Sequence, residues 1–255
     1  MSQTHLVIPD SHAHPDHNND RALWIGQLIA DLQPDVVVNL GDTADMPSLA
    51  SYDKGKKSFQ GRTYARDISA HGDFQEKLWS ATKRKKKKQP RKVTLIGNHE
   101  QRIERAIQVQ PELEGTVTYD DLDLDHYYHD VVHYNGGTPG TISIDGVTYA
   151  HYFISGVMSK PVGGEHPAYT LLSKVHDSVT QGHTHVYDYC IRGRQSGSPI
   201  MSFVAGCAFD YSSGWAGDAN RLYHRGVAVK RSVENGVYDL EWISLTRLKK
   251  EYDKQ

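Results

Sequence analysis

The chain has 255 residues, 24% of them charged, and a formal net charge of −2 at pH 7. It is therefore long enough to bury a substantial core and has no overall charge that favours nucleic acid or a membrane. Only two cysteines occur, outside any CxxC or CxxH spacing, and no stretch has the pattern of a signal peptide or the roughly 18 apolar residues of a membrane span, so we expect a cytoplasmic protein of a cell or of a phage-infected cell.

Three apolar segments of the first half are predicted strands, and each ends in polar residues. They cover residues 5–10, 35–42 and 92–100. A helix capped by Asn19 or Asp20 is predicted between the first two and ends before Pro34. A strand, helix and strand in this order are typical of parallel sheets. Ligands bind at the carboxyl edge of such sheets, so we expect the polar residues there to form a site.

A basic insertion of polar, irregular pattern separates the second and third strands, at about residues 43–91. It culminates in KRKKKKQPRK, from Lys83 to Lys92, and the stretch from Lys54 to Lys92 holds 14 of the 29 Lys and Arg of the chain. Such a run is usually a solvated helix end or loop. The alternative is contact with a nucleic acid or nucleotide through its phosphates, and the aromatic residues interleaved in the insertion would add stacking.

The second half reads as a β-rich region. Residues 140–153 alternate as a hairpin that turns at Asp145 and Gly146, and a helix is predicted from about residue 166 to residue 177. Four further strands are predicted near residues 187–194, 200–209, 226–233 and 236–245. We expect a second, mostly antiparallel sheet for this half, and a loop at residues 153–168 that lies over the site. The whole chain is interpreted as one domain.

The stretch DSHAHPDH, which begins at Asp10, matches two metalloenzyme signatures. As His-x-His-x-Asp-His, from His12 to His17, it resembles the metallo-β-lactamase fold, but that family needs a sheet layer before this motif and only eleven residues precede His12. As Asp-x-His it resembles the first motif of the calcineurin-like metallophosphoesterases. Four later segments continue that second resemblance in order: GDTAD, GNHE, a lone His151 and GHTH. Five motifs in order make the second resemblance the stronger one.

This resemblance implies an α/β fold of two packed β-sheets flanked by helices, with a dinuclear metal site at the strand ends. It implies one metal held by Asp10, His12, Asp42 and His185, and a second held by Asp42, Asn98, His151 and His183. Nitrogen and oxygen ligands suit two divalent cations, with Mn²⁺ expected and Fe, Zn²⁺ or Ni²⁺ as alternatives. His151 departs from the family, which usually has Gly after this His, because Tyr152 follows it.

The implied activity is hydrolysis of phosphate mono- or diesters by a hydroxide that the metals activate. His99 resembles the general acid of the family, and Asp45 would orient it. The protein phosphatase branch has an Arg where this chain has Met46, so that branch is disfavoured, unless Arg62, Arg66 or Arg102 replaces the missing side chain. A nuclease that uses the basic insertion, a serine/threonine phosphatase-like enzyme and a binding module without turnover are the alternatives.

Overall fold

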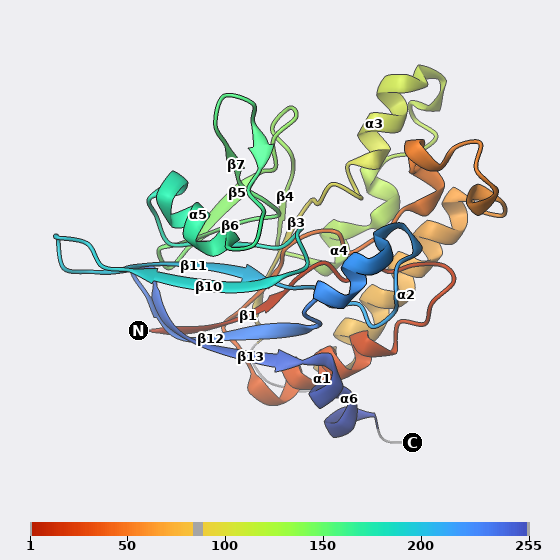
Figure 1. Cartoon of the computed structure of the whole chain (residues 1–255). Coiled ribbons are helices and arrows are strands. Elements are labelled where there is room, and N and C mark those ends of the chain that lie inside the picture. The colour runs from red at the N-terminus through yellow and green to blue at the C-terminus, as the bar shows by residue number, and fades with distance from the viewer. Residues whose placement is uncertain (1, 84–88, 254–255) are drawn as a thin grey trace.

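A computed structural model describes residues 2–83 and 89–253. A six-stranded sheet forms its centre, in the order β13-β12-β1-β2-β3-β4 (Figure 1). Neighbouring strands from β1 to β4 are parallel, whereas β12 pairs antiparallel with both β1 and β13. The strands are β1 Gln3–Ile8, β2 Val36–Asn39, β3 Arg91–Leu95, β4 Asp130–Val132, β12 Gly226–Glu234 and β13 Val237–Ser244.

This sheet is buried on both faces. Successive side chains of a strand point to opposite faces, so each strand contributes to both layers. Leu6 and Ile8 of β1 face the helices, and Val7 faces the second sheet. The helical layer beside this first sheet contains α1 Asp20–Leu32, α2 Tyr64–Lys83 and α6 Leu245–Tyr252. Two further α-helices are α3 Arg102–Val109 and α4 Leu124–Tyr127. No helix in the described part of the chain combines the length and apolar composition of a membrane span.

The second sheet has five strands, in the order β10-β11-β9-β6-β5. They are β5 Thr141–Ile144, β6 Val147–Ala150, β9 Val179–Gln181, β10 Tyr187–Arg192 and β11 Ile200–Ala205. Val38 and Val93 of the first sheet share one apolar cluster with Tyr149 and Phe203 of the second, and α5 Pro167–Val175 covers the outer face. The expected fold class, two packed sheets flanked by helices, is confirmed.

The expectation of a mostly antiparallel second sheet was wrong in two respects. The strands β12 and β13 belong to the first sheet, because β12 pairs along β1 from Gln3 opposite Val233 to Val7 opposite Ala228. The second sheet is mixed, since β9 is parallel to both β6 and β11. Antiparallel pairs therefore lie at one edge of the first sheet and at both edges of the second, whereas β1 to β4 of the first sheet, whose ends can form a site, are parallel.

The sequence indicated an irregular insertion at residues 43–91, and this expectation was wrong. Its largest element is the 20-residue helix α2, which packs against α1 and buries Phe74, Leu78 and Trp79 in the core. Of the basic run from Lys83 to Lys92, residues 84–88 lie outside the described residues. The described flanks of that run are the end of α2 and the start of β3.

Candidate metal centre

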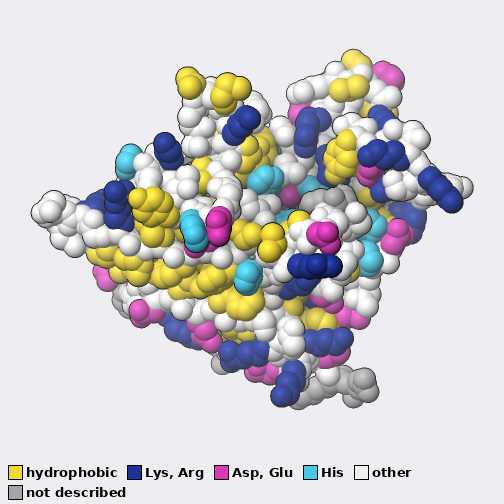
Figure 2. Space-filling view, viewed as in Figure 1, with side chains coloured by type: hydrophobic (Ala, Val, Ile, Leu, Met, Phe, Trp, Pro, Cys, Tyr) yellow, Lys and Arg dark blue, Asp and Glu magenta, His cyan; other side chains and the backbone are white. Residues whose placement is uncertain are grey.

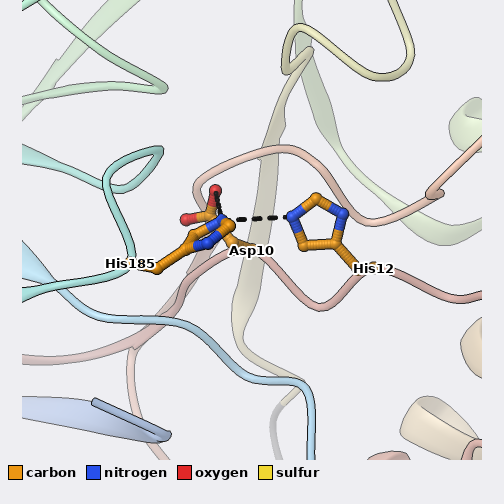
Figure 3. A group of neighbouring side chains, drawn as sticks. All are labelled: Asp10, His12 and His185. Atoms are coloured by element: carbon orange, nitrogen blue, oxygen red, sulfur yellow. Dashed lines mark hydrogen bonds and ion pairs between the residues drawn. The ribbon is translucent and has the colours of Figure 1, made fainter. Parts of the chain in front are cut away.

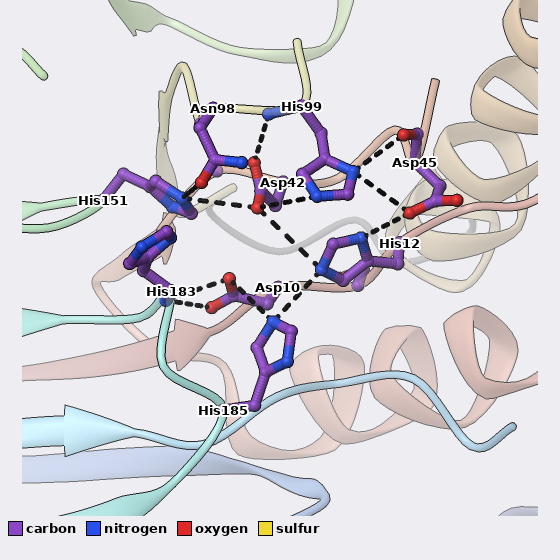
Figure 4. Close-up of polar contacts among 12 residues, drawn as sticks. Asp10, His12, Asp42, Asp45, Asn98, His99, His151, His183 and His185 are labelled. Atoms are coloured by element: carbon purple, nitrogen blue, oxygen red, sulfur yellow. Dashed lines mark hydrogen bonds and ion pairs between the residues drawn. The ribbon is translucent and has the colours of Figure 1, made fainter. Parts of the chain in front are cut away.

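The carboxyl ends of β1, β2 and β3 bring the first three motifs together, and the loops after β6 and β9 add the other two (Figure 4). Several of the residues there turn the chain through a left-handed backbone conformation. The φ angles are 26° at Asp10, 44° at His12, 49° at Asp42, 67° at His183 and 61° at His185. This conformation is uncommon outside glycine and is concentrated at functional sites.

One group of donors comes from β1 and from the loop after β9. Asp10, His12 and His185 are buried, and each offers a ligand atom within 4.8 Å of the others (Figure 3). The two imidazole Nε2 atoms lie 3.2 Å apart, and the Asp10 Oδ1 lies 3.5 Å from the Nε2 of His185. A carboxylate and two imidazoles are a donor set that Mn²⁺, Fe or Zn²⁺ accepts.

Asp42 is the centre of the site, as Figure 4 shows. Its Oδ2 lies 3.3 Å from the Nε2 of His151, 3.8 Å from that of His99 and 3.9 Å from that of His12. Asp42, His151 and His183 form a second metal-compatible group, and the Oδ1 of Asn98 lies 3.0 Å from the Nε2 of His151. One carboxylate thus faces donors of both groups, and all seven residues expected as ligands converge there.

Asp45 links His12 and His99. Its Oδ1 lies 2.8 Å from the Nδ1 of His12 and 3.1 Å from the Nδ1 of His99, and its backbone oxygen lies 2.7 Å from the same His99 nitrogen. Each ring therefore directs its Nε2 toward Asp42. His99 also belongs to a metal-compatible group with His12 and Asp42, so its position suits a role as ligand as well as a role as acid.

Two glycines make room for the carboxylates. A Cβ at Gly97 would collide with the side chain and amide of Asp42, and a Cβ at Gly182 would collide with the carboxylate of Asp10. The same Asp10 carboxylate accepts the backbone N–H of His183, with both oxygens 2.9 Å from that nitrogen. The motifs therefore need glycine at these positions because a carboxylate occupies the space of the missing side chain.

The charges in the site shift the pKa values of Asp42 and His151 in the direction opposite to the effect of burial. Burial alone would raise the pKa of Asp42, but the charges of His151 and His99 outweigh it and hold this pKa well below its ordinary value. Burial alone would lower the pKa of His151, but Asp42 outweighs it and raises the pKa to about 9. Burial and the charge of His99 lower the pKa of His12 to about 4, so His12 is a neutral imidazole, as a metal ligand must be.

The hydrogen bonds of His151 indicate whether a metal cation can bind between its ring and the neighbouring oxygens. Its Nδ1 lies 2.9 Å from the carbonyl oxygen of Leu40 and must donate to it. The Nε2 faces oxygens of Asn98 and Asp42, where the raised pKa shows that this environment favours positive charge. A divalent cation would bind these oxygens and the ring nitrogen together. Histidines that bind a metal usually donate a hydrogen bond from the other ring nitrogen, as Nδ1 does here. The residues fit a metal.

Arg102 is the one candidate of the three arginines that reaches this centre. Its Nη2 lies 3.1 Å from the Nε2 of His99, and its Nη1 donates to the backbone oxygen of Asp45 at 2.8 Å and of Met46 at 3.1 Å. The other two are bound elsewhere: Arg62 pairs with Asp53, and Arg66 pairs with Asp16. Met46 itself is fully buried. Arg102 therefore supplies a cation beside the site from α3.

The loop at residues 153–168 does not line the cavity beside the metal-compatible groups. It forms a hairpin of β7 Ile154–Ser155 and β8 Lys160–Pro161. The cavity, of about 780 Å³, is lined instead by α3 and residues 48–54. Of these lining residues, Arg102 was named from the sequence, and the others were missed because nothing in their sequence marks them, apart from the basic side chains of the insertion.

The flanks of the basic run lie away from the metal-compatible groups. Arg91 opens β3, whereas the site lies beyond its other end, and Arg91 pairs with Asp130 at 2.8 Å. The Lys92 ammonium lies 4.1 Å from the centre of the Trp79 ring. These two cations already have intramolecular partners at the opposite edge of the sheet.

No family model and no curated protein matches the chain. Among solved structures, TT1561 of Thermus thermophilus is similar over 96% of this chain and 100% of its own, at 12% identity and a TM-score of 0.39. Yfce, a phosphoesterase from E. coli, is similar over 95% of this chain and 99% of its own, at 12% identity and a TM-score of 0.39. Likenesses this distant do not specify an activity, so the function rests on the site itself.

Proposed function

We propose that this chain is a metal-dependent hydrolase of phosphate esters with a dinuclear centre. The arrangement around Asp42 carries the proposal, because one buried carboxylate faces imidazoles from three different strand ends within 3.9 Å. A bridging carboxylate offsets the repulsion of two neighbouring cations. The five-motif resemblance to calcineurin-like metallophosphoesterases supports the same assignment.

Two sets of side chains would hold the cations, with Asp42 common to both. The chemistry that such a pair supplies is activation of water and neutralisation of charge on the phosphoryl oxygens. Mn²⁺ is the metal we propose, and the same donors suit Fe, Zn²⁺ and Ni²⁺. The first set is Asp10, His12, Asp42 and His185, and the second is Asp42, Asn98, His151 and His183.

The side chains around the leaving group are His99, Asp45 and Arg102. We propose that His99, protonated on both ring nitrogens, donates a proton from Nε2 to the leaving oxygen, while Asp45 holds the Nδ1–H of the same ring. Arg102 Nη2, which donates to this Nε2 at 3.1 Å in the structure, would instead bind a phosphoryl oxygen when substrate is present. By the resemblance, Arg102 would take over the phosphate-binding role that the protein phosphatase branch gives to an Arg at the position of Met46.

The test compares a phosphomonoester and a phosphodiester of p-nitrophenol in the presence of Mn²⁺, with the wild-type chain and Asp42→Asn. The proposal expects hydrolysis of at least one ester and its fall to background in the variant. Turnover that survives in Asp42→Asn would contradict a bridging role. Metal binding without turnover of either ester would favour a binding module.

The partner and the place of action are also proposals. A nucleic acid partner is proposed from the basic run of Lys83 to Lys92, whose central residues lie outside the described part of the chain. Both cysteines, Cys190 and Cys207, are free thiols, which supports action in the reducing cytoplasm.

A further inference from the structure

The cavity next to the candidate metal centre continues along α3 as a groove. Its lining begins at Asp42, His183 and His185 and ends at Val109 and Gln110. Val109, the last residue of α3, lies seven positions after Arg102, so the groove follows the helix for roughly 10 Å at 1.5 Å per residue. Figure 2 shows this face of the molecule hollowed between two projecting lobes, with histidine side chains at the bottom of the hollow. This length exceeds what one phosphate group needs.

Three cations line the groove, two beside the candidate site and one at the end of α3. Arg102 contacts His99, and Arg105 donates to the backbone oxygen of Asn98 at 2.5 Å. Lys54 lies at the far end, where its ammonium donates to the side chain of Gln110 at 3.3 Å. Arg105 and Lys54 are held by neutral groups, and no described carboxylate holds any of the three, so their charges are directed by the fold and remain available to an anion.

The carboxylates that usually balance such cations are absent from the described residues of this wall. Asp42, which belongs to the metal-compatible groups, is the only acid among the lining residues. No described carboxylate forms an ion pair with Arg102, Arg105 or Lys54, in contrast to the neighbouring Lys56 and Arg62, which both pair with Asp53. A recessed wall with uncompensated positive charge attracts and positions anions.

The groove also has surface for the organic part of a ligand. The ring of Tyr52 lines it and is 54% exposed, and its hydroxyl accepts from Arg102 at 2.9 Å. Val109, 76% exposed, lies at the other end. The Arg102 guanidinium carbon lies 5.6 Å and the Lys56 ammonium 5.8 Å from the centre of the Tyr52 ring. A half-exposed aromatic ring among cations suits a nucleotide, since a base can stack on its open part while the phosphates bind the cations.

We propose that the groove along α3 binds a second phosphate group of the substrate, with Arg105 and Lys54 as specificity-determining residues. This inference rests on the proposed phosphoesterase function and deepens it. The substrate class is a nucleotide ester that carries a further phosphate beyond the one that is cleaved. Two sources share this chemistry: a nucleotide chain, and a nucleoside polyphosphate.

The first experiment measures kcat/KM in Mn²⁺ for three chromogenic esters. They are p-nitrophenyl thymidine 5′-phosphate, the same ester with a 3′-phosphate, and the γ-p-nitrophenyl ester of thymidine triphosphate. The wild-type chain should prefer at least one of the last two over the first. The preference ratio should fall about two- to fivefold for each of Arg105→Ala and Lys54→Ala, and Lys174→Ala, which removes an exposed cation of α5 far from the groove, should keep it.

The two phosphorylated probes separate the two sources. A preference for the 3′-phosphate alone identifies a nucleotide chain, and a preference for the triphosphate ester alone identifies a nucleoside polyphosphate. Equal kcat/KM for all three esters, or a preference that survives in both variants, overturns the proposal while leaving the hydrolase function in place.

A binding measurement decides the proposal even if no ester is hydrolysed. Fluorescence anisotropy of a labelled oligothymidylate, in EDTA and with tripolyphosphate as competitor, needs no turnover. We expect weaker binding in the Arg105→Ala, Lys54→Ala double variant than in Lys174→Ala. The slope of log affinity against log salt should be smaller by about 0.7 for each cation removed, the value for a single strand. Equal binding and equal slopes would overturn the proposal.

Discussion

Glu100 holds Asp42 in place through the backbone. Its Oε2 lies 3.0 Å from the amide nitrogen of Asp42 and 2.8 Å from that of Gly97, and its Oε1 lies 2.8 Å from that of Ala44. Burial and the charge of Asp42 raise the pKa of Glu100 to about 7. One carboxylate therefore joins the ends of β2 and β3, the two strands that supply the centre of the site.

Glu100→Gln should weaken metal binding while the fold persists. An amide has one accepting oxygen, so it can bind one side of this backbone and must place its NH₂ against N–H groups on the other. Support of this kind is worth about 10- to 100-fold in metal affinity. Calorimetric titration with Mn²⁺ measures it, with the exposed Glu104→Gln as control. Equal affinity in both variants would refute the role of Glu100.

Gly182→Ala should remove the Asp10 group of donors. The new methyl would occupy the space of the Asp10 carboxylate, which must then leave His185. Gly163→Ala is the matched control, because a Cβ there meets only the methyl of Thr184 at 3.6 Å. Metal content by mass spectrometry should fall in the first variant and stay at the wild-type value in the second. A full metal complement in Gly182→Ala would show that Asp10 is not a ligand.

His99→Ala should lower the rate of hydrolysis much more than it lowers metal binding. A general acid contributes about 10²- to 10⁴-fold, so kcat should fall by a factor in that range while the metal content is unchanged. The exposed His126→Ala serves as the control for loss of a histidine. Loss of metal from His99→Ala would assign this residue to the ligands, as its distances to Asp42 and His12 also permit.

His71 should make the fold sensitive to acid. It lies on α2, is 1% exposed, and burial lowers its pKa to about 4. The unfolded chain binds a proton at His71 below about pH 6.5 and the folded chain does not, so stability is lost as pH falls from about 6.5 toward 4. Denaturant unfolding at pH 7 and pH 5 should show a smaller loss in His71→Leu. An equal loss in both chains would contradict a buried neutral imidazole.

Lys230 should make the fold more stable in alkali. It is fully buried in the sandwich, its ammonium lies 4.0 Å from the Tyr238 ring centre, it donates to Thr180, and burial holds its pKa well below the ordinary value. Between the folded pKa and the unfolded value of about 10.4, the unfolded chain binds more protons. Stability should therefore rise by about 1.4 kcal/mol per pH unit. Denaturant unfolding of Lys230→Met across this range should lack this contribution, and an unchanged slope would contradict it.

The residues of the site were predictable because parallel strands end at one edge. Each motif follows an apolar strand, and the sheet needs no more than that to bring Asp10, Asp42 and Asn98 together. Arg102 was one of three candidate arginines, but the support from Glu100 and the position of Arg105 on α3 were not predictable in the same way. Their positions depend on how α3 leaves the end of β3, which no local pattern encodes.

The errors in the fold have physical causes. The buried stripe of α2 alternates apolar residues with Asp67, His71 and Gln75, so its apolar periodicity was too weak to indicate a helix. The strand β12 has the composition of any buried strand, and its partner β1 lies more than 200 residues away in the chain. Pairing over such distances depends on tertiary packing, which propensity does not describe.

The site contains residues from both sheets, so it forms late in folding. His12 and His185 meet across 173 residues of sequence, as do Asp10 and His183. Contacts this distant form slowly, since the loop between them must close first. During synthesis the first three motifs emerge long before the last two, so a cation can be enclosed only when nearly three quarters of the chain has been made. If the chain binds metal as proposed, capture is then a late event, and it can still precede the strands β10 to β13, which follow His185 in the chain.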